Sequence, residues 1–201
     1  MSEHKRELIL AAAREIFEAE GLEGASLRAI AARAGYTPAA LYFHFPSKEA
    51  IYAELLLISL SALGDAIRHA ASGLAAPQEQ LRAAAMGFFS FYFARPRDLD
   101  LGFYLFHGGM RPAGLGPDYD EVLNAALTAA LSPITEAAEA LGTSVVEANM
   151  LTADIFAHAV GLLLLAHTRR IRLFGAAPQS LMEAHLDDRL SKIGERRRRE
   201  V

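Results

Sequence analysis

Two prolines set the length of one short helix, and this helix constrains the fold more than any other part of the sequence. In "TPAALYFHFPSK" (37–48), Thr37 suits a helix cap and Pro38 suits a first turn. Pro46 disfavours helical geometry in the residue before it. A helix of about two turns is unstable alone in water, so its neighbours must hold it.

The rest of the sequence is also helical in pattern. No stretch alternates apolar and polar residues with a period of two. Apolar residues recur at helical spacing between Leu27 and Ala34, with Ser26 before them as a cap and Gly35 after them as a stop. We therefore expect an all-α protein. The expected helices lie near 8–20, 26–34, 37–45, 47–71, 77–94, 98–107, 118–141, 144–170 and 178–193.

Composition and charge exclude several classes of protein. Hydrophobic residues make up 52% of the 201, enough for a buried core, and the formal net charge of −4 argues against coating nucleic acid by bulk charge. The absence of cysteine excludes disulfides, thiolate zinc sites and cysteine nucleophiles. The N-terminus lacks the apolar core of a signal peptide, and the apolar run 155–167 is too short to span a bilayer. We expect a cytoplasmic protein without a membrane partner.

Catalytic and metal-binding patterns are weak. No serine sits in a nucleophile elbow, and we find no glycine-rich phosphate loop and no carboxylate pair in an apolar stretch, so we expect neither an enzyme nor a cofactor. His107, Asp154, His158 and His167 raise the question of a metal, because Asp154 and His158 lie four residues apart on a helix. Two ligands without a defined third are weak evidence, and hydrogen-bonded core histidines are common, so we predict no metal site.

The short helix and the one before it form a helix-turn-helix, because two helices of about eight residues are joined by a tight turn that contains glycine. In such a motif the second helix projects side chains into the major groove of DNA. Leu41 and Phe45 can pack inward, which leaves Tyr42 on the opposite side. Arg28, Arg33 and Lys48 lie in a segment, 26–48, without acidic residues. Basic charge is therefore expected on one local face.

The stretch "SLRAIAARAGYTPAALYFHFPSKEAIYAEL" (26–55) resembles the DNA-binding domain of the TetR family of bacterial transcriptional regulators. The resemblance covers about the first fifty residues, whereas the rest of the chain is similar only in helix layout. It implies a three-helix helix-turn-helix domain over 1–48 and a larger helical ligand-binding and dimerisation domain over 49–201. The helix at 48–71 would connect the two.

The resemblance also implies which side chains contact DNA: Arg28, Thr37, Pro38, Ala39, Tyr42, His44 and Lys48. Arg28 could reach a guanine edge, and Pro38 and Ala39 could touch thymine methyl groups. His44 and Lys48 would bind phosphate, while Thr37 and Tyr42 would bind the backbone or a base. The alternative is that Tyr42, Phe43 and His44 are core residues, and for Phe43 the two interpretations remain open.

The second domain offers a weaker signal for a ligand pocket. Eight of the seventeen aromatic residues fall between Phe88 and Phe106, pointing to all sides of their helices. They form either a packed core or an apolar cavity, and the resemblance favours a cavity that holds a small, largely apolar effector. The expected lining residues are Phe88, Phe91, Tyr92, Phe103, Tyr104, His107, Met110 and His158.

Two apolar stripes on long helices could pair with their copies around a two-fold axis. One stripe consists of Leu123, Leu127 and Leu131, and the other of Ile155, Ala159, Leu162, Leu163 and Ala166. The alternative is that both stripes are intramolecular core. The basic segment 196–199 could touch DNA, although a solvated terminus explains it equally simply.

The resemblance implies a homodimeric repressor that binds double-stranded DNA at an inverted-repeat operator. A small apolar effector would release it. The alternative function is a ligand-independent architectural or chromosome-organising DNA-binding protein.

Overall fold

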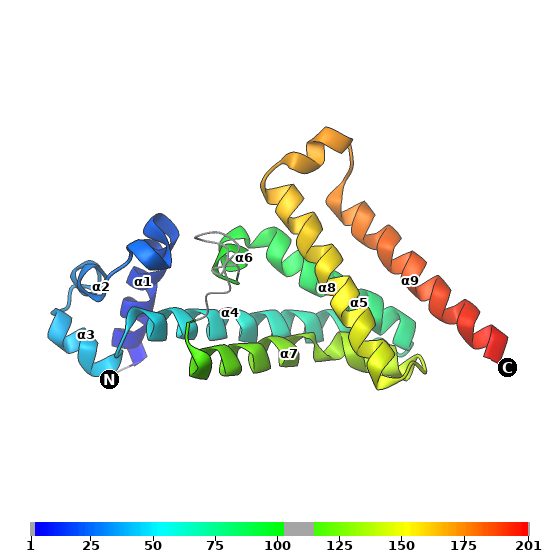
Figure 1. The fold of residues 1–201 in the computed structure, drawn as a ribbon, viewed down its shortest axis with the longest axis horizontal. Coiled ribbons are helices and arrows are strands. Elements are labelled where there is room, and N and C mark those ends of the chain that lie inside the picture. Colours follow the sequence, from blue (N-terminus) through cyan, green and yellow to red (C-terminus); the bar gives the residue numbers. More distant parts are fainter. Residues whose placement is uncertain (1–2, 103–114, 201) are drawn as a thin grey trace. The chain divides into compact units, whose positions relative to one another are not determined.

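The computed structural model describes residues 3–102 and 115–200, and all of the regular structure in these residues is helical (Figure 1). The elements are α1 (Glu3–Gly24), α2 (Leu27–Ala34), α3 (Pro38–His44), α4 (Lys48–Ala71), α5 (Pro77–Ala94), α6 (Pro96–Gly102), α7 (Pro117–Ala140), α8 (Val145–His167), the 3-10 segment η2 (Arg170–Phe174) and α9 (Pro178–Glu200). The expectation of an all-α protein is confirmed.

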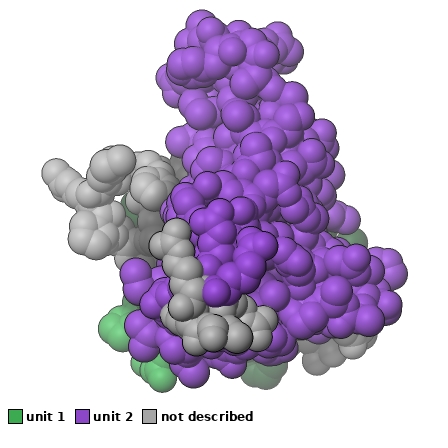
Figure 2. All heavy atoms as spheres, turned by 90° about the vertical axis from the view of Figure 1, so that its right-hand side faces the viewer, with its two compact units in different colours: residues 1–60, 97–127 green, residues 61–96, 128–201 purple. Residues whose placement is uncertain are grey.

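The chain forms two compact units (Figure 2). Unit 1 contains residues 1–60 and 97–127, and unit 2 contains residues 61–96 and 128–201. Each unit is discontinuous in sequence, whereas the predicted domains were two continuous stretches. The difference arises because α4 and α7 each run from one unit into the other.

In unit 1, capping interactions define the ends of α2. The Oγ of Ser26 accepts a hydrogen bond from the backbone N–H of Ala29 at 3.2 Å. At the other end Gly35 adopts the left-handed conformation with φ 75°, and its N–H bonds back to the last turn of the helix. Gly21, at φ 69° and ψ 176°, interrupts α1 where the sequence indicated a stop, although helical structure resumes beyond it.

In unit 2, α8 packs against both α5 and α9. Figure 1 shows α8 and α9 running in opposite directions as a hairpin, with η2 at the bend. Ser144 and Glu147 form the capping box expected at the start of α8. α7 continues through Pro133, where a kink was expected from the sequence. The bend at η2 was not predicted, because the sequence pattern extended the helix to residue 170.

Two helices, α4 and α8, are long and apolar enough to cross a membrane when judged by length and composition alone. The predicted apolar run 155–167 is short, but α8 extends it to 23 residues, so length alone does not exclude a membrane span. Core helices of soluble proteins pass the same test.

We expect Gly35→Ala to lower the free energy of unfolding by about 1–2 kcal/mol, because alanine is strained at a left-handed position. A Cβ at Gly35 would meet no atom within 4 Å, so the loss would report backbone strain rather than a clash. Gly194→Ala is the matched control, since its Cβ also meets open space but its φ is not in the left-handed range. Urea unfolding followed by circular dichroism measures both. Equal stability of the two variants would contradict this account of the cap.

Candidate nucleic-acid interface

The short helix α3 is held from both ends and from beneath. The Oγ1 of Thr37 accepts a hydrogen bond from the N–H of Ala40 at 3.3 Å, as the sequence predicted for a cap. Leu41 and Phe45 are buried, and the guanidinium of Arg6 lies 5.3 Å from the centre of the Phe45 ring. The neighbours therefore supply the stability that a helix of seven residues lacks by itself.

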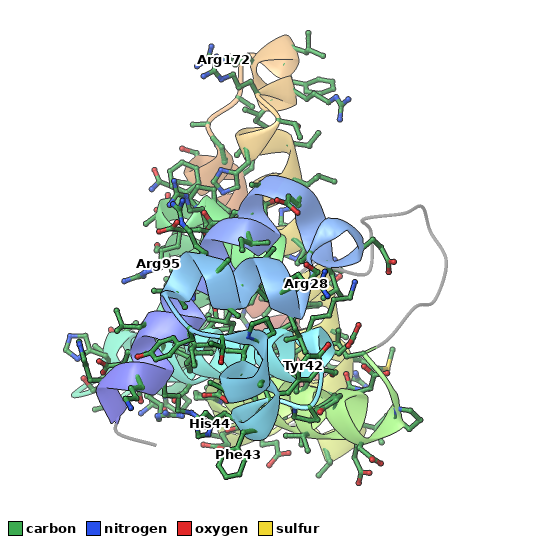
Figure 3. The ribbon with its side chains drawn as sticks, turned by 90° about the vertical axis from the view of Figure 1, so that its left-hand side faces the viewer. Arg28, Tyr42, Phe43, His44, Arg95 and Arg172 are labelled. Atoms are coloured by element: carbon green, nitrogen blue, oxygen red, sulfur yellow. The ribbon has the colours of Figure 1, made fainter. Side chains whose placement is uncertain are left out.

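The opposite side of α3 is open to solvent (Figure 3). Tyr42 is 58% exposed and Phe43 is 86% exposed, so neither is a core residue. His44 is half-buried, and its ring meets that of Phe43 edge to face, with centroids 5.0 Å apart. The structure thus decides the alternative left open for Phe43. This side chain was absent from the predicted DNA contacts, because an aromatic residue in a short helix gives no signal of its direction.

The remaining predicted contacts on α3 lie at its start. Thr37 and Ala39 are exposed, while Pro38 is half-buried. These residues offer little hydrogen-bonding capacity besides the Thr37 hydroxyl, which already accepts a bond from the helix. Their methyl and methylene groups suit apolar contacts with a thymine methyl group.

Of the three basic residues expected to face DNA, two have structural partners. The Nε of Arg33 donates a hydrogen bond to Glu15 at 2.7 Å. The Nζ of Lys48 donates to the carbonyl oxygens of Leu22 at 2.7 Å and Glu23 at 3.3 Å. One N–H of this ammonium group remains for a phosphate, and that contact stays a prediction.

Arg28 is different, because its guanidinium is exposed and forms no ion pair with any residue the structure describes. Figure 3 shows it on α2, while Tyr42, Phe43 and His44 come from α3. A guanidinium can bind guanine O6 and N7 bidentately, a phenol can bind a phosphate or base, and a phenyl ring can contact a thymine methyl group. The arrangement is therefore suited to direct base readout, and that role stays a prediction.

The predicted ligand-lining residues that the structure describes do not all lie in one place. Phe103, Tyr104, His107 and Met110 lie outside the described residues. Phe88 and Tyr92 are buried and meet edge to face, with centroids 5.2 Å apart. The ring of Phe156 also meets the Phe88 ring, at 5.5 Å between centroids. In this part of unit 2 the aromatic residues form packed core.

His158 instead lies between α8 and α9. Its ring stacks on that of His185, with centroids 3.9 Å apart and planes within 7°. Burial lowers the pKa of His158, and the neighbouring His185 lowers it further, which favours the neutral form. The Nε2 of His185 donates to Asp154 at 2.9 Å. Among residues 3–102 and 115–200, no group of three or more histidine, aspartate or glutamate side chains could hold a metal ion.

Phe91 lines an open groove in unit 2 with a volume of about 480 Å³. Most of the lining is apolar and small, and the guanidinium of Arg95 lies 4.5 Å from the centre of the Phe91 ring. The other lining residues are Ala66, Ala70, Ala83, Met86, Gly87 and Ser90. Sequence reasoning missed Arg95, because the prediction was built on the aromatic residues of this segment and a single arginine among them gave no signal of a ligand contact.

The side chains predicted to form the dimer interface face the interior of the single chain. Leu123, Ile155, Ala159, Leu162 and Leu163 are buried, and Leu127, Leu131 and Ala166 are half-buried. The exposed apolar residues of α8 are others, namely Val145, Val146, Met150, Ala153, Ala157, Gly161 and Leu164. The periodicity could not separate the two faces, because the buried and the exposed face of α8 both carry mainly apolar residues.

Comparisons with known proteins identify the N-terminal motif. The family model described as "Bacterial regulatory proteins, tetR family" matches residues 9–55. The transcriptional activator FasR of Mycolicibacterium smegmatis is 35% identical over 89 residues, which are 44% of this chain and 41% of FasR. The regulator UidR of Escherichia coli K12 is 46% identical over 52 residues, 26% of each protein. The chain thus matches less than half the length of these relatives.

Solved structures extend the similarity to the whole fold. The fatty acid degradation regulator FadR from Bacillus halodurans superimposes with a TM-score of 0.66 at 14% identity, covering 93% of this chain and 95% of FadR. The regulator PfmR from Thermus thermophilus gives a TM-score of 0.56 at 21% identity, covering 89% of this chain and 94% of PfmR. At these identities the likeness shows a shared fold.

We expect Lys48→Met to lower the free energy of unfolding by about 1–3 kcal/mol, because two carbonyl groups at the end of α1 lose their donor. Lys5→Met, at an exposed lysine, is the control and should stay within about 0.5 kcal/mol of the parent. Chemical denaturation measures both. Unchanged stability with weakened binding to every DNA sequence would instead make Lys48 chiefly a phosphate contact.

Proposed function

We propose that the chain is a homodimeric repressor of the TetR type, released from a near-palindromic operator by a small, largely apolar effector. The match of residues 9–55 to the TetR family model and the shared fold support this proposal. DNA binding and transcriptional regulation are supported by the same family match and by the similarity to FasR and UidR over part of the chain. One observation carries the proposal: α3 buries Leu41 and Phe45 while it presents Tyr42 and Phe43 to solvent. A helix held in this way is a recognition helix.

Within the interface, Arg28, Tyr42 and Phe43 carry sequence discrimination. Arg28 binds a guanine edge, because its guanidinium is not engaged by a carboxylate in the described chain. Tyr42 and Phe43 contact the backbone and a thymine methyl group from the exposed side of α3. Thr37, Pro38, Ala39 and His44 fill the surface between these anchors. With Arg33 paired to Glu15, few cations remain for phosphate, and we expect a shallow salt dependence.

A second copy covers the exposed side of α8. Only 28% of the most apolar window of this helix is buried in the single chain, against 56% for α4. Exposed residues recur along α8 at intervals of three or four: Val146, Met150, Ala153, Ala157, Gly161 and Leu164. The small residues are central, and Met150 and Leu164 lie at equal distances from Ala157 along the chain. An antiparallel pairing of two α8 helices across a two-fold axis at Ala157 would match each large residue with its counterpart.

The effector is the least constrained part of the proposal. The ring contacts of Phe88 with Tyr92 and Phe156 support the alternative of a ligand-independent architectural DNA-binding protein, because these aromatic residues pack against one another. The groove beside Arg95 supports effector binding, since it offers an apolar floor and one cation. Titration of a purified protein–operator complex with apolar carboxylic acids, alcohols and amines decides between them. Release by one class supports an effector, and no release by any supports the architectural alternative.

We expect Tyr42→Ala and Phe43→Ala each to weaken operator binding about 10- to 100-fold while the fold stays intact, since both side chains are exposed. The operator is first obtained by selection from a random double-stranded DNA pool, where an inverted repeat should be enriched. Val122→Ala, an exposed residue on α7, should bind normally. Parent-like binding by both aromatic variants would mean that α3 does not read DNA.

We expect Ala157→Cys to form a disulfide-linked dimer on mild oxidation, because a residue on a two-fold axis meets itself. The chain contains no cysteine, so the introduced thiol has only its own copy as a partner. Met150→Cys and Leu164→Cys should cross-link only when the two variants are mixed. Ser90→Cys, an exposed position on α5, is the control that should stay monomeric in non-reducing electrophoresis. Equal cross-linking of Ser90→Cys and Ala157→Cys would contradict this register.

A further inference from the structure

The bend between α8 and α9 carries an exposed basic and apolar surface that no described part of the chain covers. This surface, the η2 tip, consists of Arg169, Arg170, Arg172, Leu173 and Phe174. Leu173 is 81% exposed and Phe174 is 71% exposed, so both apolar side chains lie in water. Figure 3 shows Arg172 at the tip of the hairpin, away from the body of unit 2.

The charge of the η2 tip is unbalanced. Its three arginines are exposed and form no ion pair with the residues that the structure describes. No acidic residue occurs between Asp154 and Glu183 in the sequence. Arg169 also holds φ at 60°, and among the described residues it is the single non-glycine with positive φ. A conformation of this kind costs free energy and persists where the surroundings require it, often at a functional position.

A surface of opposite character lies at the other end of α8. This surface, the α7–α8 turn, consists of Glu136, Glu139, Val145 and Val146. All four are exposed, and neither glutamate forms an ion pair with a described residue. Glu147 is not part of it, because its carboxylate is already held by Ser144 and Arg196. The turn therefore offers two unpaired carboxylates beside two exposed valines.

The two surfaces cannot meet within one chain. α8 has 23 residues, so they lie about 34 Å apart along its axis. An antiparallel pairing of two α8 helices brings the C-terminal end of one helix beside the N-terminal end of the other. The exposed stripe advances close to 3.6 residues per turn, so the helices cross at a shallow angle and their ends stay near each other.

We propose that the η2 tip of one copy docks on the α7–α8 turn of a second copy, and that symmetry repeats this contact at both ends of the dimer. This inference rests on the proposed homodimer. It specifies the contact that fixes the register of the two paired α8 helices. Arg170 and Arg172 pair with Glu136 and Glu139 of the second copy. Leu173 and Phe174 cover the two valines, so apolar surface that is exposed on both sides is removed from water together.

A charge-swap experiment tests the contact. Arg170→Glu with Arg172→Glu should weaken dimerisation about 10- to 100-fold, because two attractive pairs become repulsive at each end. Glu136→Arg with Glu139→Arg should weaken it similarly. The chain that carries all four changes should return to within about threefold of the parent. Sedimentation equilibrium measures the dimer constant, and the differences should shrink at high salt because these charges are exposed.

The control is Arg68→Glu, which reverses an exposed arginine on α4 in unit 2 and should leave the dimer constant unchanged. Circular dichroism confirms that each variant is folded. A second test needs no charge change: Val145→Cys and Leu173→Cys should form a disulfide only when the two variants are mixed. Cross-linking within either variant alone would overturn the register.

The possible results distinguish failure of the proposed contact from failure of the proposed homodimer. If the parent is a dimer but neither charge reversal alters its constant, the proposed contact is wrong and the homodimer stands. If the parent is monomeric at micromolar concentration, both fail. If the reversals abolish binding to vesicles of phosphatidylglycerol but leave dimerisation unchanged, the η2 tip binds an anionic lipid surface instead. Loss of operator binding with dimerisation intact would assign the tip to DNA and overturn the proposal in the same way.

Discussion

The burial of Leu41 and Phe45 beneath a helix of two turns is the interaction on which the DNA-binding end depends. α3 is too short to persist by itself, so its geometry is that of the pocket that holds it. The same packing fixes which side of α3 faces outward, and thereby exposes Tyr42 and Phe43. The packing that stabilises α3 therefore also determines which of its side chains are presented for recognition.

The charges around this helix mainly serve the fold. Arg33 binds Glu15, Arg6 binds Glu54, and Lys48 satisfies two carbonyl groups at the end of α1. A lysine that donates to carbonyl oxygens replaces the hydrogen bonds that a helix end would otherwise make with water. We propose that the consequence for function is a head with few phosphate contacts, in which Arg28 supplies a guanidinium that has no ion-pair partner among the described residues. Such a head depends on base contacts more than on bulk attraction.

Much of the fold follows from local sequence chemistry, and the failures have a common cause. Ser26, Gly35 and the Ser144–Glu147 pair act through neighbours within a few residues, so their capping roles could be predicted. Lys48 reaches carbonyl groups more than twenty residues away in the chain, and no local pattern reports such a contact. The direction of Phe43 was equally hidden, because an aromatic side chain suits a core and a DNA contact alike.

The predicted dimer stripe on α8 illustrates a second limit of sequence patterns, because its residues are largely buried within the single chain. Hydrophobic periodicity identifies a buried face only when the opposite face is polar, and the exposed side of α8 carries mainly apolar residues such as Met150. Ile155 and Leu163 were chosen for their spacing, yet Ala157 and Gly161 recur with the same period about half a turn away. Burial within the folded chain is the information that separates them.

A weakly charged head makes the proposed second copy important for function. One head reads only a half-site, and with few phosphate contacts its affinity for DNA is low. Two heads joined rigidly bind their half-sites as one event, so the affinity of the pair greatly exceeds that of either. This gain is lost when the spacing of the heads no longer matches the half-sites. The contacts that fix the register of the two α8 helices would then also fix operator affinity, and an effector that shifts them slightly would release the protein.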